Sequence, residues 1–315
     1  MSLPASLQER LRLPAVASPM FIVSNPDLVI AQCKAGIVGS FPALNARPAE
    51  ELEVWLKRIT EELDAWNQAN PDQPAAPFAV NQIVHKSNNR LEHDLEMCVK
   101  YKVPIVITSL GARVDVNEAI HSYGGLVFHD IINNFFAKKA IEKGADGLIA
   151  VAAGAGGHAG TQSPFALVQE IREWFDGPLL LSGSIAKGDA ILAAQAMGAD
   201  LAYMGTRFIS THEANADPAY KQMLVDSGAS DIVYTDAVSG TNANFLWPSL
   251  AAAGFSREQL TLSLGKGKIK DMQDEADEDV HHDRQVLNEL KALVEQVDPE
   301  AFRKLQVLLR MLRDL

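Results

Sequence analysis

The stretch KGADGLIAV, residues 143–151, decides the fold because it joins the end of a helix to a buried strand. Gly144 suits the left-handed backbone conformation that closes a helix, and an apolar run follows it at once. The phrase MGADLAYMG, residues 197–205, repeats this arrangement around Gly198. Two such junctions predict units in which a helix leads into the next strand of a parallel sheet.

The same alternation extends over most of the chain, with short runs rich in Val, Ile and Leu between longer segments of helical periodicity. The predicted strands are residues 15–23, 36–41, 77–84, 103–110, 125–131, 146–153, 177–183 and 200–208. The predicted helices are residues 26–34, 47–68, 89–100, 114–122, 133–143, 164–175, 187–197 and 215–226. Eight such units predict an α/β fold, a (β/α)₈ TIM barrel; an open doubly wound sheet is the alternative.

The segment SPFALVQEIREWF, residues 163–175, predicts one of these helices in detail. Ser163 is the expected N-cap and Pro164 the first helical residue, because proline tolerates the free start of a helix. The apolar positions expected on the buried face are Phe165, Leu167, Val168 and Ile171.

Composition limits the classes of function. The 315 residues carry 40 acids and 28 bases, a net charge of −12, which argues against a nucleic-acid partner because phosphate contacts need clustered cations. Cys33 and Cys98 are the only cysteines and form no CxxC, so neither a disulfide framework nor a metal site is expected. No signal peptide or membrane span is recognisable in the sequence, and a cytoplasmic location away from membranes is expected.

The composition of the sequence changes near residue 265. DMQDEADED, residues 271–279, holds six acids and no base, which is typical of a solvated linker. The apolar positions after it recur at helical spacing. We therefore predict a barrel with inserted loops over residues 1–264, followed by an acidic linker and a C-terminal helical hairpin over residues 265–315.

The stretch VAAGAGGHAG, residues 151–160, is the first candidate site. Gly154-x-Gly156-x-x-Ala159 matches a dinucleotide fingerprint, but the helix signal begins only at Ser163, whereas a Rossmann helix starts within the motif. In a barrel this stretch follows the sixth strand, at the end where active sites are built. His158, bordered by residues without bulk, is the candidate catalytic residue.

The next two strand ends carry the phrases LLLSGSIAKG and YMGTRF. Glycine-exposed N–H groups and a hydroxyl in these loops commonly form a phosphate site in barrels, and Ser182, Gly183, Gly205 and Thr206 suit it. A phosphate site in a barrel points to a phosphorylated cofactor such as FMN. Other polar or flavin-compatible residues at strand ends are Pro19-Met20, Asn81-Gln82, His85-Lys86 and His129-Asp130.

Taken together, these phrases resemble the nitronate monooxygenases, a family of FMN-dependent barrel enzymes. The resemblance runs from about residue 14 to about residue 260 and includes SPMFIVSNPDLVIAQCKAGIVGSFPALNARP, PFAVNQIVHKSNNRLEHDL and LLLSGSIAKGDAILAAQAMGADLAYMGTRFI. It implies that His158 is the catalytic histidine. It also implies FMN contacts at Pro19, Met20, Asn81, Gln82, Asp130, Gly157, Gly183, Gly205 and Thr206; some relatives carry Lys at the position of Asp130.

The activity implied by the resemblance is oxidation of an alkyl nitronate by dioxygen to a carbonyl compound and nitrite. The expected partners are FMN, a small anionic nitronate and dioxygen, with self-association into a homo-oligomer left open. Two alternatives remain: NAD(P)H-dependent reduction of quinones or enoyl thioesters through FMN, and a flavin-binding protein without turnover. The chain departs from the family at TNANFLWPSL, residues 241–250, where similar proteins carry a Gly-Asn-Tyr-Leu phrase.

Overall fold

The structure, a computed structural model, describes residues 3–238, 240–257 and 260, apart from the side chain of Ser6. Contacts divide the chain into two compact units, and the first covers Met1–Thr235 and Thr241–Arg257. All elements below belong to this unit. The predicted boundary at residue 264, the acidic linker and the C-terminal hairpin lie outside the described residues.

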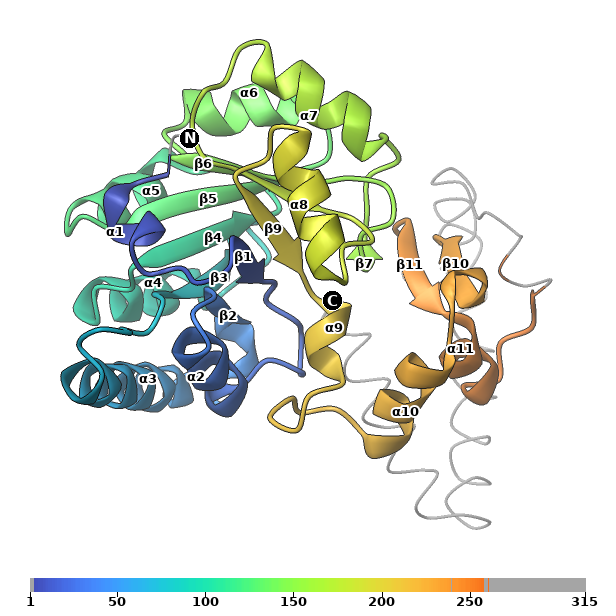
Figure 1. Ribbon diagram of the computed structural model, residues 1–315, viewed down its shortest axis with the longest axis horizontal. Helices are drawn as coiled ribbons and strands as arrows, with labels where there is room; N and C mark the ends of the chain where they lie inside the picture. The colour runs from blue at the N-terminus through green and yellow to red at the C-terminus, as the bar shows by residue number, and fades with distance from the viewer. Residues whose placement is uncertain (1–2, 239, 258–259, 261–315) are drawn as a thin grey trace, which may run out of the picture. The chain divides into compact units, whose positions relative to one another are not determined.

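Eight parallel strands form the central sheet in the order β1-β9-β8-β6-β5-β4-β3-β2 (Figure 1). A bridge between Val16 and Val38 joins β1 to the chain entering β2, with Ala17 N donating to Val38 O at 2.8 Å. The sheet therefore closes on itself, which confirms the barrel and rules out the open sheet. The strands are β1 Ala15–Ala17, β2 Gly39–Pro42, β3 Phe78–Ile83, β4 Ile105–Ser109, β5 Leu126–Ile131, β6 Gly147–Val151, β8 Leu179–Ser182 and β9 Leu201–Met204.

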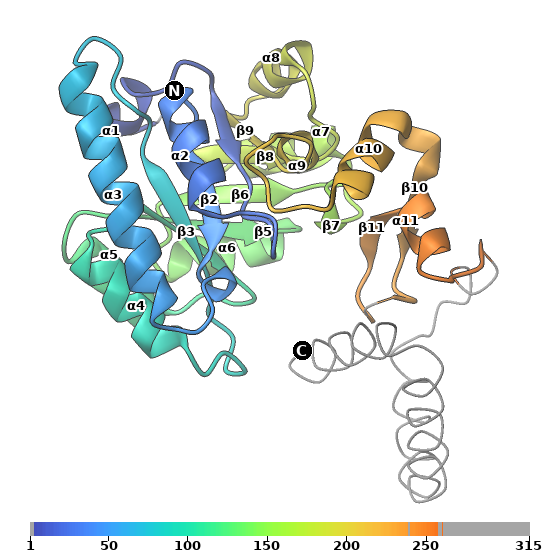
Figure 2. The same cartoon turned by 90° about the horizontal axis from the view of Figure 1, so that it is seen from below.

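Seven helices alternate with these strands and surround the barrel (Figures 1 and 2). They are α2 Pro26–Lys34, α3 Glu51–Ala69, α4 Leu91–Lys100, α5 Val114–His121, α6 Asn134–Glu142, α7 Pro164–Arg172 and α8 Gly188–Ala196. The eighth predicted helix corresponds to α10, Pro218–Asp226, which follows the short α9, Thr206–Ile209. The remaining short helices are α1 Ala5–Gln8, η1 Ala43–Asn45, η2 Ala229–Asp231 and α11 Trp247–Ala252.

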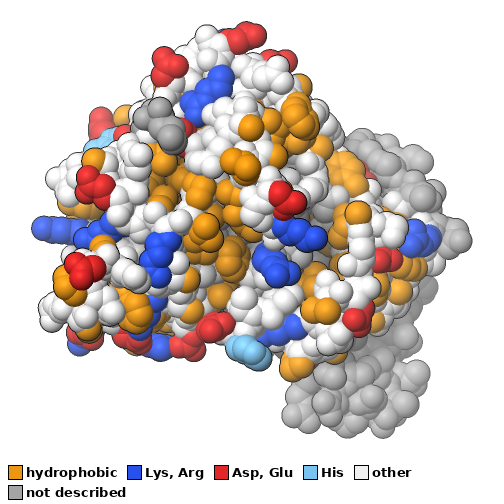
Figure 3. Space-filling model, viewed as in Figure 1, with side chains coloured by type: hydrophobic (Ala, Val, Ile, Leu, Met, Phe, Trp, Pro, Cys, Tyr) orange, Lys and Arg blue, Asp and Glu red, His pale blue; other side chains and the backbone are white. Residues whose placement is uncertain are grey.

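The barrel interior is a packed apolar core built from alternate strand residues. Leu7 of α1 and Val38, which precedes β2, belong to the same cluster. Its other buried members are Val16, Ala79, Ile105, Ile107, Phe128, Ile149, Leu180 and Leu201. The intervening residues face the helices and form separate apolar clusters with them. On the outside, Figure 3 shows hydrophobic side chains gathered over β1, β9 and α8. The described residues include no helix of the length and apolar character that a bilayer crossing requires.

Local predictions are confirmed at several helix ends. Gly144 and Gly198 have φ values of +94° and +113° directly after α6 and α8. Ser163 is the N-cap of α7 and Pro164 its first residue. Phe165, however, is 61% exposed, so its predicted place on the buried face is wrong. It lies two positions before Leu167, about 200° around the helix, and therefore faces away from the sheet.

Two strands end well before their predicted ends at residues 23 and 208. β1 stops at Ala17, because the chain turns over the next residues and Ile22 takes a left-handed φ of +67°. β9 stops at Met204, and Thr206 already begins α9. A second, antiparallel sheet was not predicted: its strands are β10 Ile232–Thr235, β11 Ala243–Leu246 and β7 Gly157–His158, in that order.

Candidate active site

The carboxyl ends of the eight parallel strands meet at one end of the barrel, so the loops that follow them form its mouth. A row of polar side chains crosses this mouth on the inner face of three neighbouring strands. Asn81 Nδ2 donates to Ser109 Oγ at 2.8 Å and to Ile107 O at 3.1 Å. Ser109 Oγ in turn donates to Asp130 Oδ2 at 2.6 Å. The structure thus joins the predicted Asn81 and Asp130 through Ser109, which the sequence did not single out.

The environment of Asp130 disfavours the charged form of its carboxyl. Burial raises the pKa of its carboxyl to about 6, against the opposing effect of the hydrogen bond from Ser109. Tyr203, on the inner face of β9, has its pKa raised well above the ordinary value by burial and then by the charge of Asp130. The ionisation of the two groups is therefore coupled, at the carboxyl ends of β5 and β9.

Gln82 lies on the opposite side of the sheet from Asn81, as alternation along a strand requires. Its Nε2 donates to Cys98 Sγ of α4 at 3.3 Å, so the side chain faces the helix layer. Thr108 and His129 continue this outward row on β4 and β5, with Oγ1 and Nδ1 2.6 Å apart. The structure therefore separates the side chains of Gln82 and His129 from the mouth, although both were singled out with it.

His129 and Asp130 should give the protein opposing responses to pH. Burial, and secondarily the charge of Lys143, lowers the pKa of His129 to about 4 from 6.5, so stability from this group is lost as pH falls from 6.5 through 4. The raised pKa of Asp130 acts in the other sense: its contribution is complete below pH 3.8 and is lost as pH rises through about 6. In the native protein the two trends offset one another between pH 4 and pH 6.

Asp130→Asn keeps an acceptor for Ser109 but removes the titrating carboxyl. The pH dependence of stability that His129 causes should then no longer be offset by Asp130. The free energy of unfolding should then rise with pH more steeply than in the native protein, by up to about 2 kcal/mol between pH 4 and pH 7, since one pKa unit is worth about 1.4 kcal/mol and the mouth is partly open to water. Urea denaturation at pH 4.5 and pH 7 measures this difference. Parallel pH curves for the two proteins would show that Asp130 is not buried as described.

The glycines predicted to bind phosphate lie where four loops come into contact. A β-carbon on Gly183 would lie 2.7 Å from Ala153 O, and one on Gly205 would lie 2.6 Å from Ser18 Oγ. A β-carbon on Gly156 would approach Thr206 Oγ1 to 3.3 Å. The loops after β1, β6, β8 and β9 therefore meet in a cluster where a β-carbon on Gly183 or Gly205 would clash with the neighbouring loop. Ser182 and Gly183 are half-buried there, and Thr206 is exposed at its edge.

His158 stands on a strand rather than on a free loop. Gly157 and His158 form β7, whose register pairs them with Asn244 and Ala243 of β11. Asn244 Nδ2 also donates to Ala155 O at 2.7 Å. The His158 side chain is exposed and makes no hydrogen bond within the part of the chain that the structure describes. Its backbone is thus fixed by TNANFLWPSL, residues 241–250, while its imidazole is open to a ligand.

Pro19 and Met20 open the turn that follows β1, and both are half-buried. A β-carbon on Gly205 would lie 3.6 Å from Met20 Sδ, which places this side chain against the end of β9. The structure thus brings Met20 and Gly205 into contact, with Pro19 adjacent to Met20 in the chain; that they surround one ligand stays a prediction.

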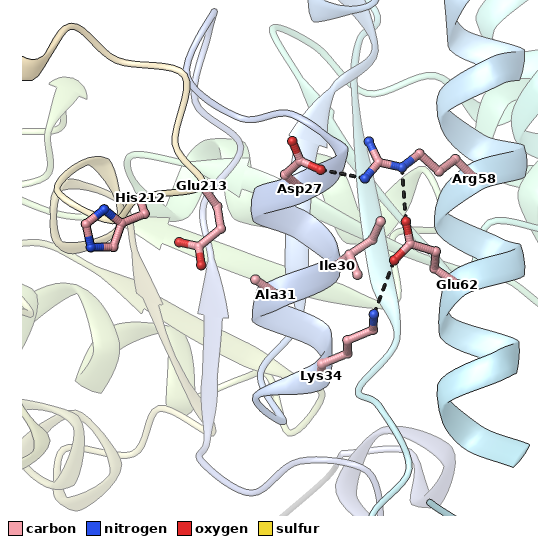
Figure 4. A pocket seen from close by; sticks show the side chains of 8 residues that line it. All are labelled: Asp27, Ile30, Ala31, Lys34, Arg58, Glu62, His212 and Glu213. Atoms are coloured by element: carbon pink, nitrogen blue, oxygen red, sulfur yellow. Dashed lines mark hydrogen bonds and ion pairs between the residues drawn. The ribbon is translucent and has the colours of Figure 1, made fainter. Parts of the chain in front are cut away.

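A charged surface groove lies outside the barrel, between α2, α3 and the segment after α9 (Figure 4). Its cations are already paired: Arg58 contacts Asp27 at 2.5 Å and Glu62 at 3.0 Å, and Lys34 contacts Glu62 at 3.2 Å. His212 and Glu213 lie on the opposite wall of the groove. Because the lining neutralises its own cations, the groove does not compete with the barrel mouth as an anion site.

Comparison with known proteins agrees with this geometry. A family model described as nitronate monooxygenase matches residues 8–266. The chain belongs to this family. Nitronate monooxygenase of Paraburkholderia phytofirmans is 27% identical over 275 residues, a match that covers 76% of this chain and 75% of that protein. The nitronate monooxygenases are flavin-dependent oxidoreductases, so the chain is an oxidoreductase of this kind.

Two solved structures share the fold of this nitronate monooxygenase family member. A nitroalkane oxidase from Streptomyces ansochromogenes matches with a TM-score of 0.67 and 25% identity, covering 77% of this chain and 79% of its own. FabK from Thermotoga maritima matches with a TM-score of 0.67 and 26% identity, covering 80% of this chain and 78% of its own. The chain is therefore as similar in fold to the one as to the other.

The residues of this family member fit FMN. The absence of β-carbons in the glycine cluster lets four loops pack closely, which brings backbone together where a phosphate needs N–H donors. The inner row offers amide, hydroxyl and carboxyl groups for a polar ring edge, and Met20 offers an apolar wall. Sequence reasoning missed Ser109 and Tyr203; the two-residue period of β4 and β9 places both on the inner face and could have revealed them.

Proposed function

We propose that this protein binds FMN at the barrel mouth and oxidises small alkyl nitronates with dioxygen to a carbonyl compound and nitrite. The observation that carries the proposal is the contact of the His158 loop with the glycine cluster. Gly156 approaches Thr206, and Ser184 N donates to Gly154 O at 3.0 Å. A group bound by the glycines would therefore lie beside the loop that carries His158.

FMN, when bound, supplies the redox chemistry, by accepting electrons from the nitronate and passing them to dioxygen. His158 acts on the substrate. As a neutral imidazole it removes the α-proton of a nitroalkane, and as a donor it holds the anionic oxygens of a nitronate. Both duties need an imidazole that is exposed and not already hydrogen-bonded. The His158 side chain is exposed and makes no hydrogen bond within the described residues, which supports this role.

Asn81, Ser109 and Asp130, on the inner face of the barrel, provide the polar groups of the site. Asn81 and Ser109 are oriented by their mutual hydrogen bond, so each presents a defined donor or acceptor toward the mouth. Asp130, with its pKa raised to about 6 by burial, is partly protonated near neutrality and can then donate as well as accept. In this proposal the three side chains orient the cofactor and do not take part in proton transfer from the substrate.

The rim of the mouth favours an apolar substituent on the substrate. Among the described residues, exposed apolar side chains gather in the loops and helix starts after β1, β4, β5 and β6. They are Phe21, Ile22, Leu110, Val114, Ile132, Phe135, Phe136 and Phe165. A small alkyl group leaves water when it contacts such a rim, which stabilises its complex by roughly 0.8 kcal/mol for each buried methylene.

The visible spectrum of the purified protein, followed under anaerobic additions, tests the proposal. We expect a flavin spectrum, FMN as the group released by acid, and bleaching on addition of ethyl nitronate or propyl-2-nitronate. Admission of air should restore the colour and yield nitrite in proportion to the nitronate consumed. Bleaching by NADH that is faster than by any nitronate would instead support a reductase. A protein that stays colourless after incubation with FMN would contradict both enzyme functions.

A further inference from the structure

The turn Met20–Ser24, which carries Met20 into the mouth, is held by the side chain of Asn45. Asn45 Nδ2 donates to Met20 O and to Ser24 O, each at 2.9 Å. Its Oδ1 accepts from Ile22 N at 3.0 Å. One amide group therefore satisfies three backbone groups of a five-residue turn, which is nearly the full hydrogen-bonding capacity of an asparagine in this position.

The turn needs such support because its conformation is unfavourable by itself. Ile22 has a φ of +67°, a region that β-branched residues rarely occupy, and its side chain is 47% exposed, so packing contributes little to holding it. From the other side, Asn215 Nδ2 donates to Ile22 O and Asn215 N to Val23 O, both at 3.0 Å. The position of the turn is thus set by hydrogen bonds to neighbouring segments.

Asn45 is itself held in place from α4. Arg90 Nη1 donates to Ala46 O at 2.7 Å, directly after Asn45 in the chain. Arg90 Nη2 pairs with Asp94 Oδ1 at 3.0 Å, and the Asp94 side chain is fully buried. Arg90, held by the buried Asp94 carboxylate, therefore fixes the backbone next to Asn45 through a charge-assisted hydrogen bond.

A displacement of the Met20–Ser24 turn would alter the contacts at the glycine cluster. The contacts already described place Met20 Sδ and Ser18 Oγ against Gly205, at the end of β9. A shift of Met20 by a few tenths of an ångström would change the wall that the cofactor meets. Within the turn itself, Met20 N donates to Ser24 Oγ and Ser24 N to Met20 O, each at 3.0 Å, so a displacement of the turn moves Met20 with it.

We propose that Asn45 is a positioning residue for the flavin. Through the Met20–Ser24 turn it sets where Met20 lies at the mouth, and so sets FMN affinity and the electronic environment of the bound ring. This inference rests on the proposed function in one respect, that FMN binds at the mouth.

Asn45→Ala and Asn45→Asp test the inference. Alanine removes all three hydrogen bonds; aspartate keeps the acceptor for Ile22 N but faces two carbonyl oxygens with a carboxylate. We expect either change to weaken FMN binding at least tenfold, measured by quenching of flavin fluorescence, and to shift the visible spectrum of the flavin that remains bound. In nitronate turnover at saturating FMN, KM should rise more than kcat falls.

Asn67→Ala is the matched control, because Asn67 Oδ1 accepts from Ala75 N at 2.8 Å in a loop at the other end of the barrel. It should lower the melting temperature without changing FMN affinity or spectrum. If Asn45→Ala does not fold, the aspartate variant decides. FMN affinity within twofold of the native protein and an unchanged spectrum in a folded Asn45 variant would overturn the inference alone. A native protein that binds no FMN would overturn it together with the proposed function.

Discussion

Replacing His158 with asparagine should slow nitronate oxidation by about two to four orders of magnitude and leave FMN affinity unchanged. The backbone of β7 is held by its pairing with β11 and not by the imidazole, so the loop should keep its place. Asparagine retains a donor but cannot accept the α-proton of a nitroalkane. A larger loss with nitroalkanes than with preformed nitronates would therefore assign His158 the role of base, and an equal loss would assign it the role of holding the anion.

Steady-state oxygen uptake and FMN fluorescence quenching measure the two halves of this prediction. His212→Asn provides the control, because His212 is an exposed histidine in the groove outside the barrel. It should retain turnover within twofold of the native rate. Near-normal turnover in the His158 variant would remove this residue from the mechanism, whatever the control does.

The fold was predictable because each of its units repeats a local signal. Gly144 and Gly198 close helices in the conformation that their sequence context indicates, and each of the eight strands overlaps its predicted apolar run. The errors arose where tertiary contacts override local propensity. Residues 18–23 continue an apolar run, yet hydrogen bonds from Asn45 and Asn215 hold them in a turn. Such side-chain bonds from distant segments leave no periodic trace in a sequence.

The candidate site was predictable only in part, for a similar reason. The motifs predicted which strand ends would carry function, but they did not separate the inner from the outer face within Asn81-Gln82 and His129-Asp130. The structure does so, with Asn81 and Asp130 on the inner face and Gln82 and His129 on the outer. The support of His158 by residues 243–244 could not be inferred, because the two strands lie far apart in the sequence and neither has the length that gives a periodic pattern.

Gly183→Ala should abolish FMN binding, with a loss in affinity of at least a hundredfold. Gly183 has a φ of +140°, which residues with a β-carbon rarely adopt, and the added carbon would lie 2.7 Å from the backbone oxygen of Ala153. Backbone cannot rotate away as a flexible side chain can, so the loops after β6 and β8 must separate. The free energy of unfolding should fall by more than about 2 kcal/mol.

Gly144→Ala is the control. It measures how much stability is lost when alanine takes a left-handed φ at a position away from the glycine cluster. Gly144 also has a left-handed φ, +94°, but no atom lies within 4 Å of the position that a β-carbon would take, and it closes α6 at the opposite end of the barrel. Its substitution should cost about 1–2 kcal/mol and leave FMN affinity unchanged. Comparison of urea denaturation and flavin titration for the two variants tests whether the glycine cluster binds the cofactor. Equal FMN affinity in both would place the phosphate elsewhere, because the Gly183 variant alone disturbs the contact between the loops after β6 and β8.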